Sequence, residues 1–218
     1  MRSAPLATLA ALVPSLLALA CAAPAPETPP TGDLPPGETA PPAARDPGAL
    51  GSTGYLTWED LSVRMVGQSG PEAGLRIDIT TLHPDAIRLA ADDIRSYLND
   101  QRGRIAERVP GPDADRLTAF LVGYTGFEKE VGFDPTRLQI RSEGSTYYAR
   151  HVLPLSPRFD RRIVDLYETV YGVYLFPPDL DLVATLQFEY GGLSSGGAWR
   201  RVVEQVQRAK TQRQSDEG

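Results

Sequence analysis

The chain has 218 residues, a formal net charge of −6 at pH 7, one cysteine and two histidines. The acidic balance argues against a nucleic-acid partner, because such proteins neutralise phosphates with an excess of Lys and Arg. The lone cysteine excludes an intrachain disulfide framework and any multi-cysteine zinc site. Hydrophobic residues make up 41% of the chain, so part of it can bury a core, and the composition excludes collagens, coiled coils and multi-span membrane proteins.

The N-terminus has the pattern of a secretory signal. Arg2 supplies a positive charge, and an apolar run follows from residue 6 to residue 20. This run is shorter than the about 20 apolar residues that a membrane span needs, and Pro14 interrupts it. We therefore predict a signal peptide over residues 1–20.

The end of this run, Leu17-Ala18-Leu19-Ala20-Cys21, resembles the lipobox of bacterial lipoproteins. In that family the cysteine is diacylated, the signal is cut before it, and the new amino terminus is acylated. The resemblance implies lipidation at Cys21 and a membrane anchor, because each buried methylene contributes roughly 0.8 kcal/mol. Ala22 follows in place of aspartate, which by resemblance to lipoprotein sorting implies the outer membrane, with the domain in the periplasm. The alternative is an ordinary cleavage site beside a chance cysteine.

A proline-rich stretch separates the predicted anchor from the rest of the chain. Residues 22–50 contain nine prolines and no aromatic residue, so they cannot offset their ordering entropy by burial. Such sequences are extended and semi-rigid. We therefore predict a lipidated tether over residues 21–50, one folded domain over residues 51–210, and a disordered tail over residues 211–218.

Short strands dominate the predicted domain. Apolar and polar residues alternate over 61–65, 75–79, 137–141 and 182–190, which is typical of strands with one wet face. More continuously apolar runs, typical of central strands, cover residues 118–124 and 170–176. A weaker strand candidate covers residues 145–152.

Two segments have helical spacing instead. Apolar residues three and four apart predict a helix within residues 85–109, which Pro110 stops. A second helix is expected after residue 197, where Trp199, Val202, Val203 and Val206 form one apolar stripe.

Because the strands are mostly separated by turns, we expect a mainly β fold. The expected architecture is an antiparallel immunoglobulin-like β-sandwich with one inserted helix and a C-terminal helix. The folded region resembles the immunoglobulin-like modules of many uncharacterised envelope lipoproteins. It is also similar to the sandwich lipoprotein that anchors the type VI secretion membrane complex.

The histidines are the first candidates for chemistry. His83 precedes Pro84 and Asp85, and Asp92 and Asp93 follow. A metal site could be imagined here, but the spacing matches no strong ligand motif, and acids are favoured at helix starts. His151 lies in an expected strand, where a packed or surface histidine is the simpler interpretation.

Other motifs also have simpler interpretations. The glycine-rich stretch 191–197, with Ser194 and Ser195, enters the second helix, but it lacks the lysine of a P-loop and is interpreted as a connector. Paired carboxylates could cleave glycosides across a cleft. The pairs in this sequence lie near turns, where solvated acids are expected; they are Glu128 with Glu130, Asp179 with Asp181, and Asp113 with Asp115.

These observations favour a lipid-anchored, non-enzymatic module that binds or scaffolds another envelope component. Its expected contacts are the membrane, through the lipid on Cys21, and an envelope protein. No catalytic, cofactor-binding or metal-binding residue is predicted. The rival hypothesis is an envelope hydrolase in which His83 or His151 meets two acids in a cleft.

Overall fold

The structure is a computed structural model that describes residues 55–109 and 116–216. The predictions for the signal peptide, for Cys21 and for the whole tether lie outside the described residues, as do Asp113 and Asp115.

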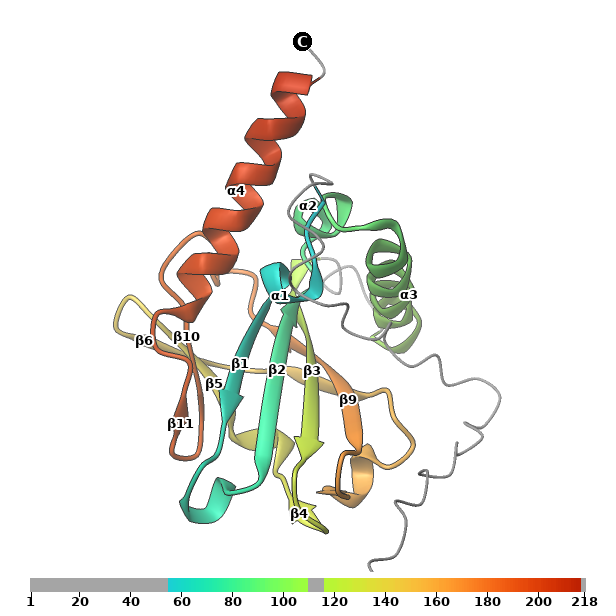
Figure 1. Ribbon diagram of the computed structural model, residues 1–218, viewed down its shortest axis with the longest axis vertical. Coiled ribbons are helices and arrows are strands. Elements are labelled where there is room, and N and C mark those ends of the chain that lie inside the picture. Colours follow the sequence, from blue (N-terminus) through green and yellow to red (C-terminus); the bar gives the residue numbers. More distant parts are fainter. Residues whose placement is uncertain (1–54, 110–115, 217–218) are drawn as a thin grey trace, which may run out of the picture. The chain divides into compact units, whose positions relative to one another are not determined.

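Two antiparallel sheets make up most of the described fold (Figure 1). The larger sheet has the order β1 (Ser62–Val66), β2 (Leu75–Thr81), β3 (Thr118–Gly126), β9 (Thr169–Phe176) and β7 (His151–Pro154). The smaller has the order β11 (Leu193–Ser194), β10 (Gln187–Tyr190), β5 (Leu138–Ser142) and β6 (Ser145–Tyr148). A two-stranded ladder joins β4 (Val131–Gly132) to β8 (Ile163–Val164).

The helices differ in length and place. The α-helices are α1 (Trp58–Leu61), α2 (Pro84–Arg88), α3 (Asp92–Arg108) and α4 (Ala198–Asp216). Single 3₁₀ turns lie at η1 (Gly70–Glu72), η3 (Pro135–Arg137) and η4 (Phe159–Arg161). Helix α4 follows β11 and continues beside α1 and α2, as Figure 1 shows.

The first core lies between the two sheets. Phe120 and Tyr124 of β3 face Phe188 and Tyr190 of β10, with ring centroids 5.3 Å and 5.9 Å apart. Alternate residues of β1, β2 and β9 complete this core, so the period of two in the sequence gives each strand a buried face. The expectation of a mainly β, antiparallel, sandwich-type fold with a C-terminal helix is confirmed at this level.

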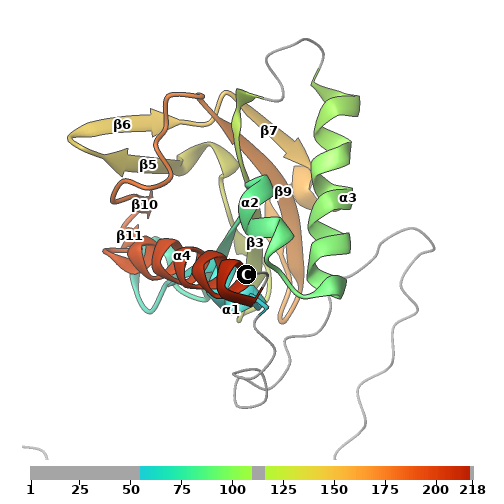
Figure 2. The same cartoon turned by 90° about the horizontal axis from the view of Figure 1, so that it is seen from above.

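The second core lies on the opposite face of the larger sheet. Leu121 of β3 and Val173 of β9 point to this face and pack with Leu98 of α3 and Ile87 of α2. Figure 2 shows the layers, with α3 on one side of β3 and β9 and with β5 and β6 on the other. Strands β3 and β9 are therefore covered on both faces, which confirms their prediction as central strands.

Close packing of the central strands depends on glycine at two positions. A Cβ on Gly172 would stand 2.7 Å from the ring of Phe159, and one on Gly123 would stand 2.8 Å from the ring of Tyr171. Both approaches are closer than carbon atoms tolerate, so each aromatic ring occupies the space of the missing side chain.

The helical segment after β2 differs from its prediction. One helix was expected within residues 85–109, but the chain forms α2 and α3, with a break at Leu89 to Ala91. The cause is a backbone contact with Leu56, whose N–H donates to the Leu89 carbonyl at 2.8 Å and whose carbonyl accepts from the Ala91 N–H at 3.1 Å. Helical periodicity within one segment does not reveal a partner more than thirty positions away.

Two further boundaries differ from their predictions. The alternation over 182–190 forms a strand only from Gln187, because the preceding residues cross the end of the sandwich, where Leu182 accepts a bond from Trp199. Helix α4 continues to Asp216, whereas a disordered tail was expected from residue 211. The Arg213 guanidinium lies over the ring of Tyr55, 5.3 Å from its centroid, so the last turns of the helix have a contact with the domain.

The strand order also bears on the expected immunoglobulin-like arrangement. In immunoglobulin domains the first two strands share a sheet and the third belongs to the other. Here β1, β2 and β3 are consecutive neighbours in one sheet. The connection between β1 and β2 contains η1, and the connection between β2 and β3 contains α2 and α3. The order of the strands thus differs from that of an immunoglobulin domain.

We expect α4 to be integral to the stability of the fold. Trp199 is 2% exposed, and its indole Nε1–H donates to the Leu182 carbonyl at 2.9 Å. Removing a buried tryptophan side chain typically costs about 3–5 kcal/mol, so Trp199→Ala should lower the urea midpoint strongly. Arg200→Ala is the control on the same helix, because this exposed side chain makes an i,i+4 ion pair worth about 0.3–0.5 kcal/mol. Equal midpoints for the two variants would show that α4 is not packed on the core.

Candidate functional site

The start of α2 places His83 and Asp85 beside each other. His83 is the N-cap residue, and its imidazole Nδ1 accepts a hydrogen bond from the backbone N–H of Asp85 at 3.3 Å. Pro84 occupies the first turn, where its missing N–H costs nothing. The interpretation of Pro84 and Asp85 as a helix start is confirmed.

Helix α4 joins α2 through an ion pair between residues 125 positions apart. The Lys210 Nζ lies 2.9 Å from one carboxylate oxygen of Asp85, and Arg88 contacts the other oxygen. Both carboxylate oxygens of Asp85 are therefore engaged by cations. The ion pair thus joins α4 to the start of α2.

An apolar hollow lies along this side of α4, and we call it the α4 hollow. It has a volume of about 210 Å³. Its apolar wall consists of Leu182, Val183, Trp199, Val202, Val203 and Val206, and its polar rim includes His83, Asp85, Gln207 and Lys210. Trp199 and Val202 belong to the buried core, whereas Val203 and Val206 are only partly buried and Val183 is 69% exposed. All four residues of the predicted stripe on α4 thus line the hollow, and two of them, Trp199 and Val202, also belong to the core.

Two groups on the rim of the hollow, Asp85 and His83, have lowered pKa values, and the main causes differ. The hydrogen bond from Lys210 is the largest cause of the lowered pKa of Asp85, and Arg88 adds to it. Partial burial of the His83 imidazole is the largest cause of its lowered pKa, although the residue as a whole is exposed. Lys210, Arg102 and Arg88 lower this pKa further, and Asp85 opposes them. Near neutral pH the rim therefore carries a neutral imidazole beside an ionised carboxylate.

The structure does not bring the two histidines together. His151 lies opposite Leu175 in the β7–β9 ladder, Leu175 lies opposite Ala119, and Ala119 accepts from Leu82, which precedes His83. Three strand spacings separate the two backbones by roughly 14 Å. The contact between His83 and Asp85 runs through the backbone N–H, while the Asp85 carboxylate faces Lys210 and Arg88.

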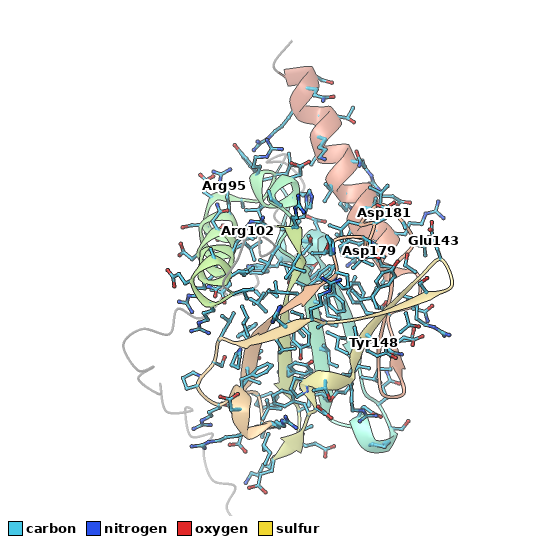
Figure 3. All side chains as sticks on the ribbon, turned by 180° about the vertical axis from the view of Figure 1, so that it is seen from behind. Arg95, Arg102, Glu143, Tyr148, Asp179 and Asp181 are labelled. Carbon is cyan, nitrogen blue, oxygen red and sulfur yellow. The ribbon has the colours of Figure 1, made fainter. Side chains whose placement is uncertain are left out.

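The two acidic pairs within the described residues occupy a turn and a loop, as the sequence indicates. Glu128 and Glu130 are exposed in the turn between β3 and β4. Asp179 and Asp181 lie in the loop beside the start of α4, where Figure 3 shows them. Asp181 has a local structural role, because its carboxylate accepts the backbone N–H of Val183 at 2.8 Å.

The glycine-rich stretch forms a short hairpin before α4. Residues Leu193 and Ser194 pair with β10 as strand β11, a ladder the sequence does not indicate. The Ser195 hydroxyl accepts the backbone N–H of Phe188 at 2.9 Å, and the Ser194 hydroxyl accepts from Gln187 at 2.7 Å. Both serine hydroxyls are engaged in holding the connector against β10.

The described residues show neither a metal-ligand cluster nor a membrane-spanning helix. Within residues 55–109 and 116–216, no three His, Cys, Asp or Glu side chains gather as a metal site would require. No helix in the same part of the chain is long and apolar enough to cross a membrane.

Comparison of the chain with protein families, curated proteins and solved structures found no match in any of the three.

The sequence contains recognisable components of the hollow but does not show that they meet. The apolar stripe after residue 197 and the segment with His83 and Asp85 each stand out, but no sequence pattern indicates that they are neighbours in space. Lys210, the residue that joins them, is one of only two lysines in an arginine-rich sequence, which is the one local signal that could have drawn attention to it. Its partner lies 125 positions earlier, and a single sequence holds no pattern at that separation.

The lowered pKa of His83 predicts a pH dependence of stability. The unfolded chain takes up a proton near pH 6.5, whereas the folded chain resists protonation until a lower pH. The free energy of unfolding should therefore fall as the pH drops from about 7 through 6.5 toward the lowered pKa, and it should be level above that window. His83→Asn keeps an N-cap side chain and removes the titration, so urea unfolding of this variant should lack the decline.

His151→Asn is the matched control for this measurement. His151 is exposed in an edge strand, so this variant should keep the wild-type pH dependence. An identical decline in wild type and in His83→Asn would contradict the assignment of the pH dependence to His83.

Proposed function

We propose that the chain is a non-enzymatic binding module of the bacterial envelope, anchored by lipid at Cys21, that binds its ligand or partner through the α4 hollow. The supporting observation is the composition of the hollow, in which six apolar side chains form the wall and a few charged and polar groups converge on the rim. Binding sites for small ligands and apolar anchors have this composition.

The lipid anchor is supported by the sequence ending in Leu19-Ala20-Cys21. With Ala22 after the cysteine, the proposed location is the outer membrane, with the domain in the periplasm. The proline-rich residues 22–50 then act as a spacer. At about 3.1 Å per residue in an extended conformation, they would allow the domain to sit up to roughly 90 Å from the lipid surface.

A hydrolase with a His and acid site receives less support. A general base needs an acid that orients its imidazole. The carboxylate beside His83 belongs to Asp85, and both of its oxygens are engaged by Lys210 and Arg88. His151 lies three strand spacings away.

The scaffold of the proposed module is an antiparallel β-sandwich, and the question of detail is whether its strand order is that of an immunoglobulin domain. The immunoglobulin-like arrangement is the finer expectation from the sequence, and the consecutive order β1, β2 and β3 argues against it. Binding through the α4 hollow does not depend on that arrangement, because its wall comes from α4, from the start of α2 and from the loop around Val183.

Lipid anchoring predicts the behaviour of Cys21→Ser in cell fractionation. Without the thiol there is no acylation, so the variant should move from the membrane pellet to the soluble fraction, and its mass should lack acyl chains. The matched control is Ser3→Ala, which changes the same leader without touching the cysteine and should stay in the pellet. A Cys21→Ser protein that still pelleted in high salt after removal of the leader would contradict the anchor.

Binding through the α4 hollow predicts a position-dependent crosslink in living cells. A photo-crosslinking amino acid that replaces Val183, which is exposed on the rim, should form a defined adduct. The same amino acid in place of Glu143, at the turn between β5 and β6 (Figure 3), is the control and should form none. Adducts of equal yield at both positions, or none at residue 183, would count against this binding face.

A further inference from the structure

A second hollow adjoins the α4 hollow and carries an excess of positive charge. We call it the cationic hollow; it has a volume of about 240 Å³ and is lined by Asp85, Arg88, Leu89, Lys210, Arg213 and Gln214. Three cations and one carboxylate face this space, on a protein whose formal net charge is −6. Asp85 and Lys210 line both hollows, so the two spaces meet at their ion pair.

The cations of this hollow retain capacity for an anion. Lys210 has three N–H donors and uses one of them on Asp85. Arg213 stacks over the ring of Tyr55, a contact that leaves its N–H donors free, and the described residues give it no carboxylate partner. Arg88 already contacts Asp85 and is otherwise exposed. An anionic group bound in this hollow could therefore accept hydrogen bonds from Lys210 and Arg213, whose positive charge Asp85 offsets only in part.

The wall of the α4 hollow favours an alkyl chain over a peptide backbone. Two backbone groups of the loop are already engaged, since the Leu182 carbonyl accepts from Trp199 at 2.9 Å and the Val183 N–H donates to Asp181 at 2.8 Å. The other wall is the side of α4, whose backbone groups bond within the helix. The backbone N–H and C=O groups of a peptide bound against this wall would lose their hydrogen bonds to water and gain few in return. The methylene groups of an alkyl chain make no such hydrogen bonds, so their burial carries no such cost.

We infer that the two hollows together bind a single-chain amphiphile with an anionic headgroup, a carboxylate or a phosphate. Its alkyl chain lies in the α4 hollow against Val203 and Val206, and its headgroup lies in the cationic hollow between Lys210 and Arg213. This inference rests on the proposed binding function and names the ligand class of the same site.

The size of the two spaces agrees with this ligand class. Pockets that bury small ligands measure about 300–1,000 Å³. The α4 hollow at about 210 Å³ and the cationic hollow at about 240 Å³ each fall below that range. A ligand that occupies both has to pass over the Asp85–Lys210 ion pair, which lines both hollows, with its apolar end in the α4 hollow and its charged end in the cationic hollow.

The test uses the full chain with Cys21→Ser, so that no acyl chain of its own competes. Decanoate, decyl phosphate and decyltrimethylammonium are titrated below their micellar concentrations by calorimetry and by tryptophan fluorescence. The two anions should bind saturably and at least tenfold more tightly than the cation, because the three alkyl chains are of similar length and the cation's headgroup has the opposite charge. Val203→Glu, which places a carboxylate in the apolar wall, should weaken decanoate at least tenfold.

The charge requirement is tested by Lys210→Gln combined with Arg213→Gln, which should remove the preference for the anions. Arg200→Gln, on the same helix but outside both hollows, is the matched control and should leave the preference unchanged. Thermal melting of each variant verifies that it is folded; should Lys210→Gln lower the melting temperature, Arg213→Gln alone still has to reduce the preference severalfold.

Three results would overturn the inference. They are no saturable binding of decanoate or decyl phosphate, equal affinity for the anions and the cation, and tighter binding of a short peptide that ends in Val-Leu. If these occur while the crosslink at residue 183 still forms, the ligand class is wrong and the binding face remains. If that crosslink is absent as well, the proposed function fails with it.

Discussion

The burial of β3 and β9 on both faces is the constraint on which the rest of the structure depends. Phe120 and Tyr124 require a cover on one side of the larger sheet, and Leu121 and Val173 require one on the other. Exposure of either face would place large apolar side chains in water, at about 25 cal/mol for each Å² of apolar surface. The smaller sheet supplies the first cover, and the helices supply the second.

Helix α4 matters because it contributes to both covers. Trp199 and Val202 belong to the core between the sheets, while Ala209, two to three turns later, belongs to the core beneath the helices. The Lys210–Asp85 ion pair is part-exposed, and pairs of this kind contribute about 0–1 kcal/mol. Burial of Trp199 therefore holds the helix in place, and the ion pair sets where α4 and α2 meet.

The α4 hollow lies between the two positions at which α4 is buried in a core, Trp199 and Ala209. Between Trp199 and Ala209, Val203 packs against the first core and Val206 against the second, but both stay partly buried and line a space that Leu182 and Val183 also line. Partly buried aliphatic side chains gathered beside charged groups are a feature of binding surfaces rather than of cores. The same packing that stabilises the sandwich thus leaves an apolar wall next to Lys210 and Arg213.

By itself the sequence determined the local features. The period of two identified β1, β2, β5 and β10, the continuous apolar runs identified β3 and β9 as central, and the stripe from Trp199 to Val206 identified a packed C-terminal helix, because each depends on residues a few positions apart. The single strand expected over residues 145–152 is instead β6 and β7, which belong to different sheets. Only the tertiary structure decided the break at Leu89, the short β10 and the meeting of Asp85 with Lys210. Each of these depends on a contact between distant segments: Leu56 with Leu89, Leu182 with Trp199, and α2 with α4. Local propensity is blind to such contacts, because their energy arises only once the chain has folded.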